Sequence, residues 1–175
     1  WMPRDLGTRY VLVNVPGYRL RAVAGGKTLA MNVVVGKSAT PTPMFSKQIT
    51  SLILNPSWGV PGKIAVKEML PKVKKDPSYL ARAGYQVTQN GASVDPASID
   101  WSSVGSHGFN YSFRQKPGDT NALGKVKFNI PDSDDIYLHD TAQRAFFKRA
   151  ERSLSHGCVR LGEPEALTRL VLQAE

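Results

Sequence analysis

The sequence predicts a mainly β fold with an inserted block that contains helices. Residues 9–55 alternate apolar and polar side chains between turn signals, and residues 124–140 alternate again. Residues 56–113 between them are rich in Gly, Pro and Lys and carry helix signals. We therefore expect a β-rich core made of residues 1–55 and 114–175, with an inserted subdomain at 56–113. The alternative is a single α+β domain with no separable insertion.

The first β stretch is divided by two turn signals. "PGY" at residues 16–18 follows a Val- and Leu-rich run at 9–15, and the Gly25–Gly26 pair separates residues 19–24 from 27–36. Paired turn residues between alternating runs are typical of hairpins, so three sequential strands are expected. Residues 47–55, "KQITSLILN", predict a further strand.

The inserted block contains residues that typically begin or end helices and one turn signal of a hairpin. Pro61 is suited to open a helix, and Asp76 before a proline is a candidate N-cap for a second helix. Gly84 is a candidate stop for that second helix. Asn90–Gly91 is a strong two-residue hairpin signal.

Two later segments also have helical texture. "TAQRAFFKRA" predicts a helix that begins near Thr141. The C-terminal segment predicts a helix with Pro164 in its first turn and an apolar face.

Composition limits the classes of partner. The chain has 175 residues, and its 23 Lys and Arg against 14 Asp and Glu give a net charge of +9. A basic balance favours an anionic partner, but no nucleic-acid-binding motif accompanies it, so we expect no nucleic acid. No apolar run approaches the ~20 residues that span a bilayer. Because the chain begins at Trp1 without a signal-peptide pattern, we expect a targeting segment to lie outside these residues.

Cys158 is the only cysteine, which excludes an intramolecular disulfide and a multi-cysteine zinc site. A free cysteine is most often a small buried hydrophobic residue. A metal site made of His107, His139, His156 and Cys158 is conceivable. His-x-Cys is not a usual ligand spacing, however, so no metal is expected.

The alternative to a buried structural thiol is a nucleophile. A nucleophilic cysteine needs a nearby histidine and thiolate character, which predicts a lowered pKa for Cys158. The N–H groups of Gly157 and Cys158 are candidate oxyanion donors. His156 and His139 compete as the base, and His139 is better placed because it ends a different predicted strand. Its second ring nitrogen then needs an acceptor, either a carbonyl at the Asp140–Thr141 turn or the Asp140 carboxylate.

Two motifs carry a resemblance to a known family. "YLHDT" at residues 137–141 and "SLSHGCVR" at 153–160 resemble the signature of the L,D-transpeptidases. "RYVLVNVPGYRL", "NPSWGVP" and "RQKPGDTNALGKVKFNIPDSDDIYLHDT" extend the resemblance to the YcbB-type (LdtD) branch over nearly the whole chain. Ala142 departs from that branch, which often has proline after "HDT".

The resemblance implies a fold and a set of site residues. The fold is the YkuD-type β-sandwich, with residues 56–113 as a capping subdomain. The implied catalytic residues are Cys158 as nucleophile, His139 as base, Gly157 and Asp140. The implied substrate-contacting residues are Tyr137, His156, Arg160, Ser155 and Trp58. No metal and no organic cofactor are implied.

The resemblance also implies an activity. It indicates a periplasmic enzyme of a Gram-negative envelope that joins peptidoglycan tetrapeptide stems, donor and acceptor, by 3→3 cross-links through a cysteine thioester. It further implies acylation by carbapenem inhibitors. Two alternatives stay open: a hydrolase or L,D-carboxypeptidase on the same scaffold, and a non-catalytic wall-binding module.

Overall fold

The computed structural model describes residues 5–131 and 135–172 and divides into two compact units. The first unit combines residues 1–54 with 126–175, and the second contains residues 55–125. Because the first unit is assembled from both ends of the chain, the second is an insertion in it.

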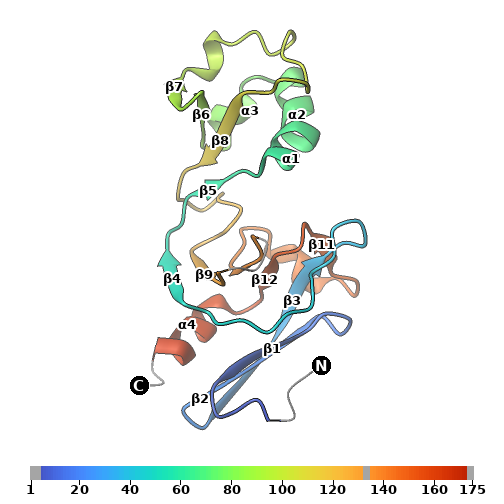
Figure 1. Cartoon of the computed structure of the whole chain (residues 1–175), viewed down its shortest axis with the longest axis vertical. Helices are drawn as coiled ribbons and strands as arrows, with labels where there is room; N and C mark the ends of the chain where they lie inside the picture. Colours follow the sequence, from blue (N-terminus) through green and yellow to red (C-terminus); the bar gives the residue numbers. More distant parts are fainter. Residues whose placement is uncertain (1–4, 132–134, 173–175) are drawn as a thin grey trace. The chain divides into compact units, whose positions relative to one another are not determined.

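Eight strands in the described part of the first unit form one hydrogen-bonded path in the order β1-β2-β3-β12-β10-β9-β4, with β11 on β3 (Figure 1). These strands are β1 (Tyr10–Asn14), β2 (Arg19–Ala24), β3 (Lys27–Gly36), β4 (Ser51–Leu54), β9 (Val126–Asn129), β10 (Leu138–His139), β11 (Ser153–Ser155) and β12 (Val159–Leu161). The predicted three-strand meander is confirmed as β1, β2 and β3. Gly25 and Gly26 have φ of 54° and 71°, as a tight hairpin requires.

The long strand β3 joins two sheets. Its residues Lys27–Asn32 pair with β2, whereas Val33 and Val34 pair with β12. One continuous apolar core contains buried residues of both sheets, so the first unit is the predicted β-sandwich. The C-terminal helix α4 (Pro164–Leu172) packs on β2 and β3 through Leu167 and Leu170, which confirms the predicted apolar face.

The second unit has its own sheet, in the order β5-β8-β6-β7, and its own apolar core around Val73, Leu80, Trp101 and Phe113. Its elements are β5 (Trp58–Gly59), α1 (Gly62–Ile64), the π-helical turn η1 (Ala65–Met69), α2 (Leu70–Lys75), α3 (Tyr79–Arg82), β6 (Tyr85–Gln89), β7 (Ala92–Val94), the 3₁₀ turn η2 (Pro96–Ser98) and β8 (Tyr111–Gln115). Asn90 and Gly91 have φ of 49° and 85° in the β6–β7 turn, so the predicted hairpin is confirmed.

The chain enters the second unit after β4 and returns from it at β9, and these two strands pair with each other. Leu54 at the end of β4 pairs with Val126 at the start of β9, and the Asn55 N–H donates to the Lys125 carbonyl over 2.8 Å. The expected boundary at residue 113 falls inside β8, which pairs with β5 and β6 of the second unit. The capping role of this unit stays a prediction.

Three local predictions differ from the structure. The segment after Thr141 forms only a 3₁₀ turn, η3 (Arg144–Lys148), in place of the expected α-helix. The Arg144 side chain hydrogen-bonds to the Leu161 and Gly162 carbonyls, and these tertiary contacts hold the segment in this conformation. Strand β4 begins at Ser51, four residues later than expected. Asp76 closes α2, and Ser78 stands at the N-cap of α3.

Within the described ranges, no helix combines the length and the apolarity that crossing a bilayer demands.

Candidate active site

Cys158 lies at the turn between β11 and β12, directly after Gly157. Gly157 has φ of 119°, a conformation that favours glycine. A Cβ atom at that position would lie 2.7 Å from Cδ1 of Ile136. The glycine therefore allows the turn to bring Cys158 to the first position before β12.

The pairing of β10 with β12 gathers four side chains on one face. The strands are parallel, and His139 lies opposite Arg160. Tyr137 precedes His139 by two residues, and Cys158 precedes Arg160 by two, so the four side chains point to the same face. The intervening residues of both strands belong to the apolar core on the opposite face. This set of four residues is called the site face below.

His139 is buried, and its ring Nδ1 lies 2.5 Å from the Asp140 carbonyl oxygen. A carbonyl only accepts, so Nδ1 carries the proton and Nε2 keeps its lone pair. Burial, reinforced by the charge of Arg160, lowers the pKa of His139 to about 3. The ring is therefore neutral at physiological pH. The Asp140 carboxylate accepts a hydrogen bond from Arg144 over 3.1 Å.

The thiol of Cys158 is half-buried and donates to the Asp135 carbonyl over 3.5 Å. Burial raises the pKa of Cys158, although hydrogen bonds from Tyr137 and the charges of Lys127 and Arg160 act in the opposite direction. The expectation of a lowered pKa is wrong for this resting site, because the loss of hydration outweighs the favourable charges. The resting site holds a neutral thiol and a neutral imidazole.

Ser155 holds the turn between β11 and β12 through two hydrogen bonds. Its side chain is 2% exposed, and its Oγ accepts from the Gly157 N–H over 3.1 Å and donates to the Cys158 carbonyl over 2.6 Å. The Gly157 N–H, expected as an oxyanion donor, is therefore engaged with Ser155 in the resting structure. Its role toward substrate stays a prediction.

His156 and Arg160 occupy different surroundings. His156 precedes Cys158 by two residues, a spacing that puts side chains on one face of a regular strand, but the positive φ of Gly157 interrupts the strand alternation between them. Nε2 of His156 instead lies 3.4 Å from the Lys37 ammonium group. Arg160 Nη1 donates to Gln143 over 2.6 Å, and the guanidinium lies 5.7 Å from the Phe146 ring centroid.

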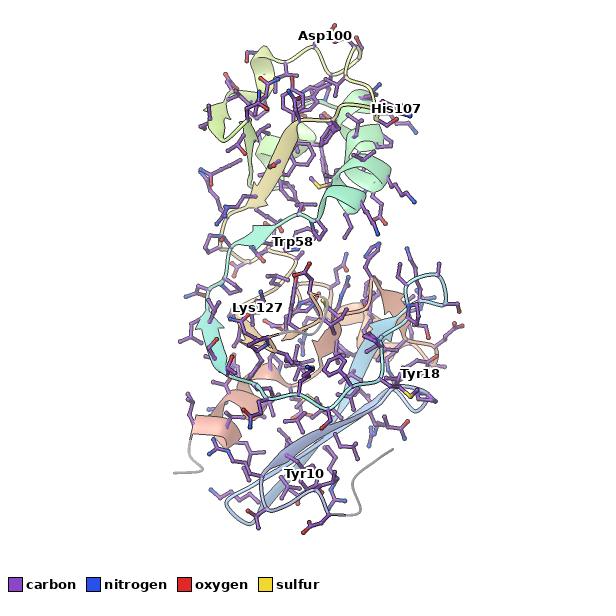
Figure 2. The ribbon with its side chains drawn as sticks, in the orientation of Figure 1. Tyr10, Tyr18, Trp58, Asp100, His107 and Lys127 are labelled. Carbon is purple, nitrogen blue, oxygen red and sulfur yellow. The ribbon has the colours of Figure 1, made fainter. Side chains whose placement is uncertain are left out.

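Two residues of this region were missed by sequence reasoning. Gln143 supports Arg160 from the segment expected to be helical. Lys127, labelled in Figure 2, lies on β9 as the register partner of His139. Its ammonium group lies 4.0 Å from the centroid of the Tyr137 ring. The alternation of "GKVKFNIP" identifies the strand, but nothing in the sequence gives its register against His139.

Trp58 and His107 belong to the second unit (Figure 2). Trp58 is half-buried on β5, with its ring centroid 6.4 Å from that of Tyr85. Its expected substrate contact stays a prediction. In the part of the chain that the structure covers, no group of three His, Cys, Asp or Glu side chains is arranged to hold a metal ion.

Comparison with known proteins identifies the family. The sequence profile of the YkuD L,D-transpeptidase catalytic domain matches residues 8–174. The chain belongs to this family. The L,D-transpeptidase domain is also 41% identical over 165 residues to a Haemophilus influenzae protein named "Putative L,D-transpeptidase". That alignment covers 93% of the chain and 33% of the relative, so the domain spans about a third of the relative's length.

The family resemblance read from the two motifs is thus confirmed. Membership of the YcbB-type branch stays a prediction. Cys158 and His139 both fall in the matched range, on the site face that β10 and β12 form.

Proposed function

We propose that this domain is a peptidoglycan L,D-transpeptidase that forms 3→3 cross-links between meso-diaminopimelate residues through a Cys158 thioester. The observation that carries the proposal is the state of His139. It is a neutral imidazole on the same face as the only cysteine, with Nδ1 bound to a carbonyl and Nε2 left as an acceptor. A base in that tautomer is what a thiol nucleophile requires.

In the acylation step, Cys158 Sγ attacks the carbonyl carbon that follows the L-centre of diaminopimelate in a donor tetrapeptide. The thiol proton passes to Nε2 of His139 as the C–S bond forms. The imidazolium then gives this proton to the nitrogen of D-alanine as the amide C–N bond breaks. Because burial and two cations disfavour the imidazolium, His139 is a strong acid in this second transfer.

The tetrahedral oxyanion needs fixed donors. The Cys158 N–H is one, and the Gly157 N–H is a second once it turns from Ser155 toward the substrate. Removal of one such donor costs roughly 3–4 kcal/mol of transition-state stabilisation in an enzyme where it has been measured. Ser155 then has the role of holding the turn in place until substrate binds.

In the second step, the amine on the D-centre of an acceptor diaminopimelate attacks the thioester carbon. Its proton passes through His139 to the departing sulfur, which returns Cys158 to the thiol. We propose that Tyr137, Arg160, His156 and Trp58 contact the two stems. Water in place of the amine would make the domain a hydrolase or carboxypeptidase.

The substrate sets the expected location, which is the periplasm of a Gram-negative cell, where peptidoglycan stems are cross-linked. Carbapenems mimic an acyl donor, so we expect them to acylate Cys158. Intact mass after carbapenem exposure should rise by one adduct, and Cys158→Ala should prevent it. An adduct on the alanine variant would mean that another residue reacts.

Product analysis tests the proposal. Purified disaccharide-tetrapeptide is incubated with the domain or with Cys158→Ala, and products are separated and sequenced by mass spectrometry. The proposal expects a 3→3 dimer and one D-alanine released per link, with neither from the variant. Tripeptide without dimer would indicate a hydrolase. Binding without either product would indicate a wall-binding module.

A further inference from the structure

Lys127 lies in a row with the site histidine. On β9 it is opposite His139 in the antiparallel pairing, and His139 is opposite Arg160 in the parallel pairing of β10 with β12. Register partners share a face of a sheet, so Lys127 and Arg160 flank His139 on the site face. His139 therefore has one cation on each side, Lys127 on β9 and Arg160 on β12.

The Lys127 ammonium group has a defined contact within this row. It lies 4.0 Å from the centroid of the Tyr137 ring, inside the range of a cation–π interaction. The Tyr137 ring centroid is in turn 5.5 Å from that of His139. Hydrogen-bonding groups of Tyr137, in its backbone and in its side chain, lower the pKa of Cys158 and so favour the thiolate. Lys127 thus lies against a residue that favours ionisation of Cys158.

Three other charged side chains of this region have contacts of their own, although Nε of Arg160 is buried without a hydrogen-bond partner among the described residues. Arg160 is bound to Gln143 and lies over Phe146. The Lys37 ammonium lies beside the His156 ring. The Asp140 carboxylate is paired with Arg144. Because His139 is neutral, the positive charges that lower the pKa of Cys158 are those of Lys127 and Arg160.

We propose that Lys127 is a positioning residue of this site, whose ammonium group holds the Tyr137 ring beside Cys158 and favours the thiolate over the thiol. The inference rests on the proposed role of Cys158 as nucleophile. It explains how a half-buried cysteine without an ionised histidine remains reactive: the charge of Lys127 opposes part of the cost of burying a thiolate. A neutral side chain of similar length fills the same space without that charge.

The test is the pH dependence of Cys158 alkylation by iodoacetamide, since the chain has a single thiol. Lys127→Met removes the charge and keeps the stem, Lys127→Gln does so with a polar end, and Lys127→Arg keeps the charge. Lys27→Met, in the β2–β3 turn region, is the control for an equal loss of net charge.

We expect the alkylation midpoint to move to higher pH in the Met and Gln variants. At a fixed pH below the midpoint, this leaves about three- to tenfold less thiolate, which corresponds to roughly half to one pKa unit. The Arg and Lys27→Met variants should stay within twofold of the parent domain. Circular dichroism of each variant reports whether it is folded.

Midpoints that do not move in the folded Met and Gln variants, or that move equally in Lys27→Met, overturn the inference. If either neutral variant at Lys127 is unfolded, the other and the Arg variant decide it by the same comparison. Alkylation needs no peptidoglycan substrate. If the cross-linking proposal fails, the alkylation result can still be interpreted. If the alkylation midpoints do not move, only the role of Lys127 is overturned and the cross-linking proposal stands.

Discussion

The Nδ1 atom of His139 lies 2.5 Å from the carbonyl oxygen of Asp140, the next residue in the chain. A main-chain carbonyl fixes the tautomer without adding a negative charge next to the ring. A carboxylate in its place would stabilise the imidazolium and raise its pKa. With the carbonyl, burial dominates and His139 stays neutral. The neutral ring can accept a proton, which fits the proposed role of His139 as the base toward Cys158.

His139 should matter more for acylation than His156. Replacing a general base lowers a rate by on the order of 10²–10⁴. We expect His139→Ala to slow carbapenem acylation by that factor. His156→Ala, whose ring contacts Lys37, should slow it far less. Stopped-flow acylation rates of folded variants provide the comparison, and a larger loss in His156→Ala would reverse the two roles.

The neutral state of His139 predicts how stability depends on pH. Its pKa is about 3 in the folded domain and near 6.5 in the unfolded chain, so the unfolded chain binds the extra proton between these values. This group should therefore lower the free energy of unfolding as pH falls from about 6.5 to about 3, and contribute no further change above 6.5.

Urea titrations at several pH values measure this dependence. His139→Asn, whose amide N–H can still reach the Asp140 carbonyl, is the matched variant because it cannot titrate. The slope of stability against pH should be smaller in the variant than in the parent across this window. Equal slopes would mean that His139 is not buried in its neutral form.

Ser155 should be needed to hold the nucleophile turn. Ser155→Ala removes one acceptor for the Gly157 N–H and one donor to the Cys158 carbonyl. Leaving such groups unpaired costs about 1–3 kcal/mol. Ser153→Ala is the control in the same strand, since Ser153 Oγ bonds to the Tyr18 hydroxyl outside the turn.

We expect Ser155→Ala to lose both stability and acylation rate, and Ser153→Ala to keep the rate. Chemical unfolding and carbapenem acylation measure the two effects. A Ser155→Ala variant that acylates at the parent rate would show that this bridge is not required for the reactive geometry.

The second unit is proposed to act as a lid over the acyl-enzyme. Because Leu54 pairs with Val126, a short Gly/Ser linker in place of residues 56–124 would connect β4 to β9 as a hairpin. We expect the shortened domain to fold, with a reactive Cys158 and a larger share of hydrolysis among its products, since closure keeps water from a thioester. Normal cross-linking by the shortened domain would show that the second unit is not a lid. Failure to fold would show that the first unit needs the second for its stability.

Local sequence signals predicted much of the fold. Gly25–Gly26 and Asn90–Gly91 fix their turns through their own backbone preferences, so both hairpins were predictable. The segment after Thr141 was not, because Arg144 is held by carbonyls of Leu161 and Gly162 that sequence reading cannot place. Tertiary contacts of this kind override local helical texture.

The candidate site residues could be chosen from the sequence, whereas their electrostatics could not. The motifs pointed to Cys158 and His139 as candidates, but the burial that raises the pKa of Cys158 and lowers that of His139 depends on the packed sandwich. Lys127 joins the site through strand register, which follows from three-dimensional pairing rather than from spacing along the chain.

The central claim is that Cys158 forms a thioester with the donor stem. Rapid quenching of the domain with disaccharide-tetrapeptide, followed by intact mass and peptide mapping, tests it most directly. The account predicts one adduct equal to the substrate minus D-alanine, carried on Cys158 and absent from Cys158→Ala, with slower accumulation in His139→Ala. Cross-linked product formed by Cys158→Ala, or an adduct mapped to another residue, would contradict it.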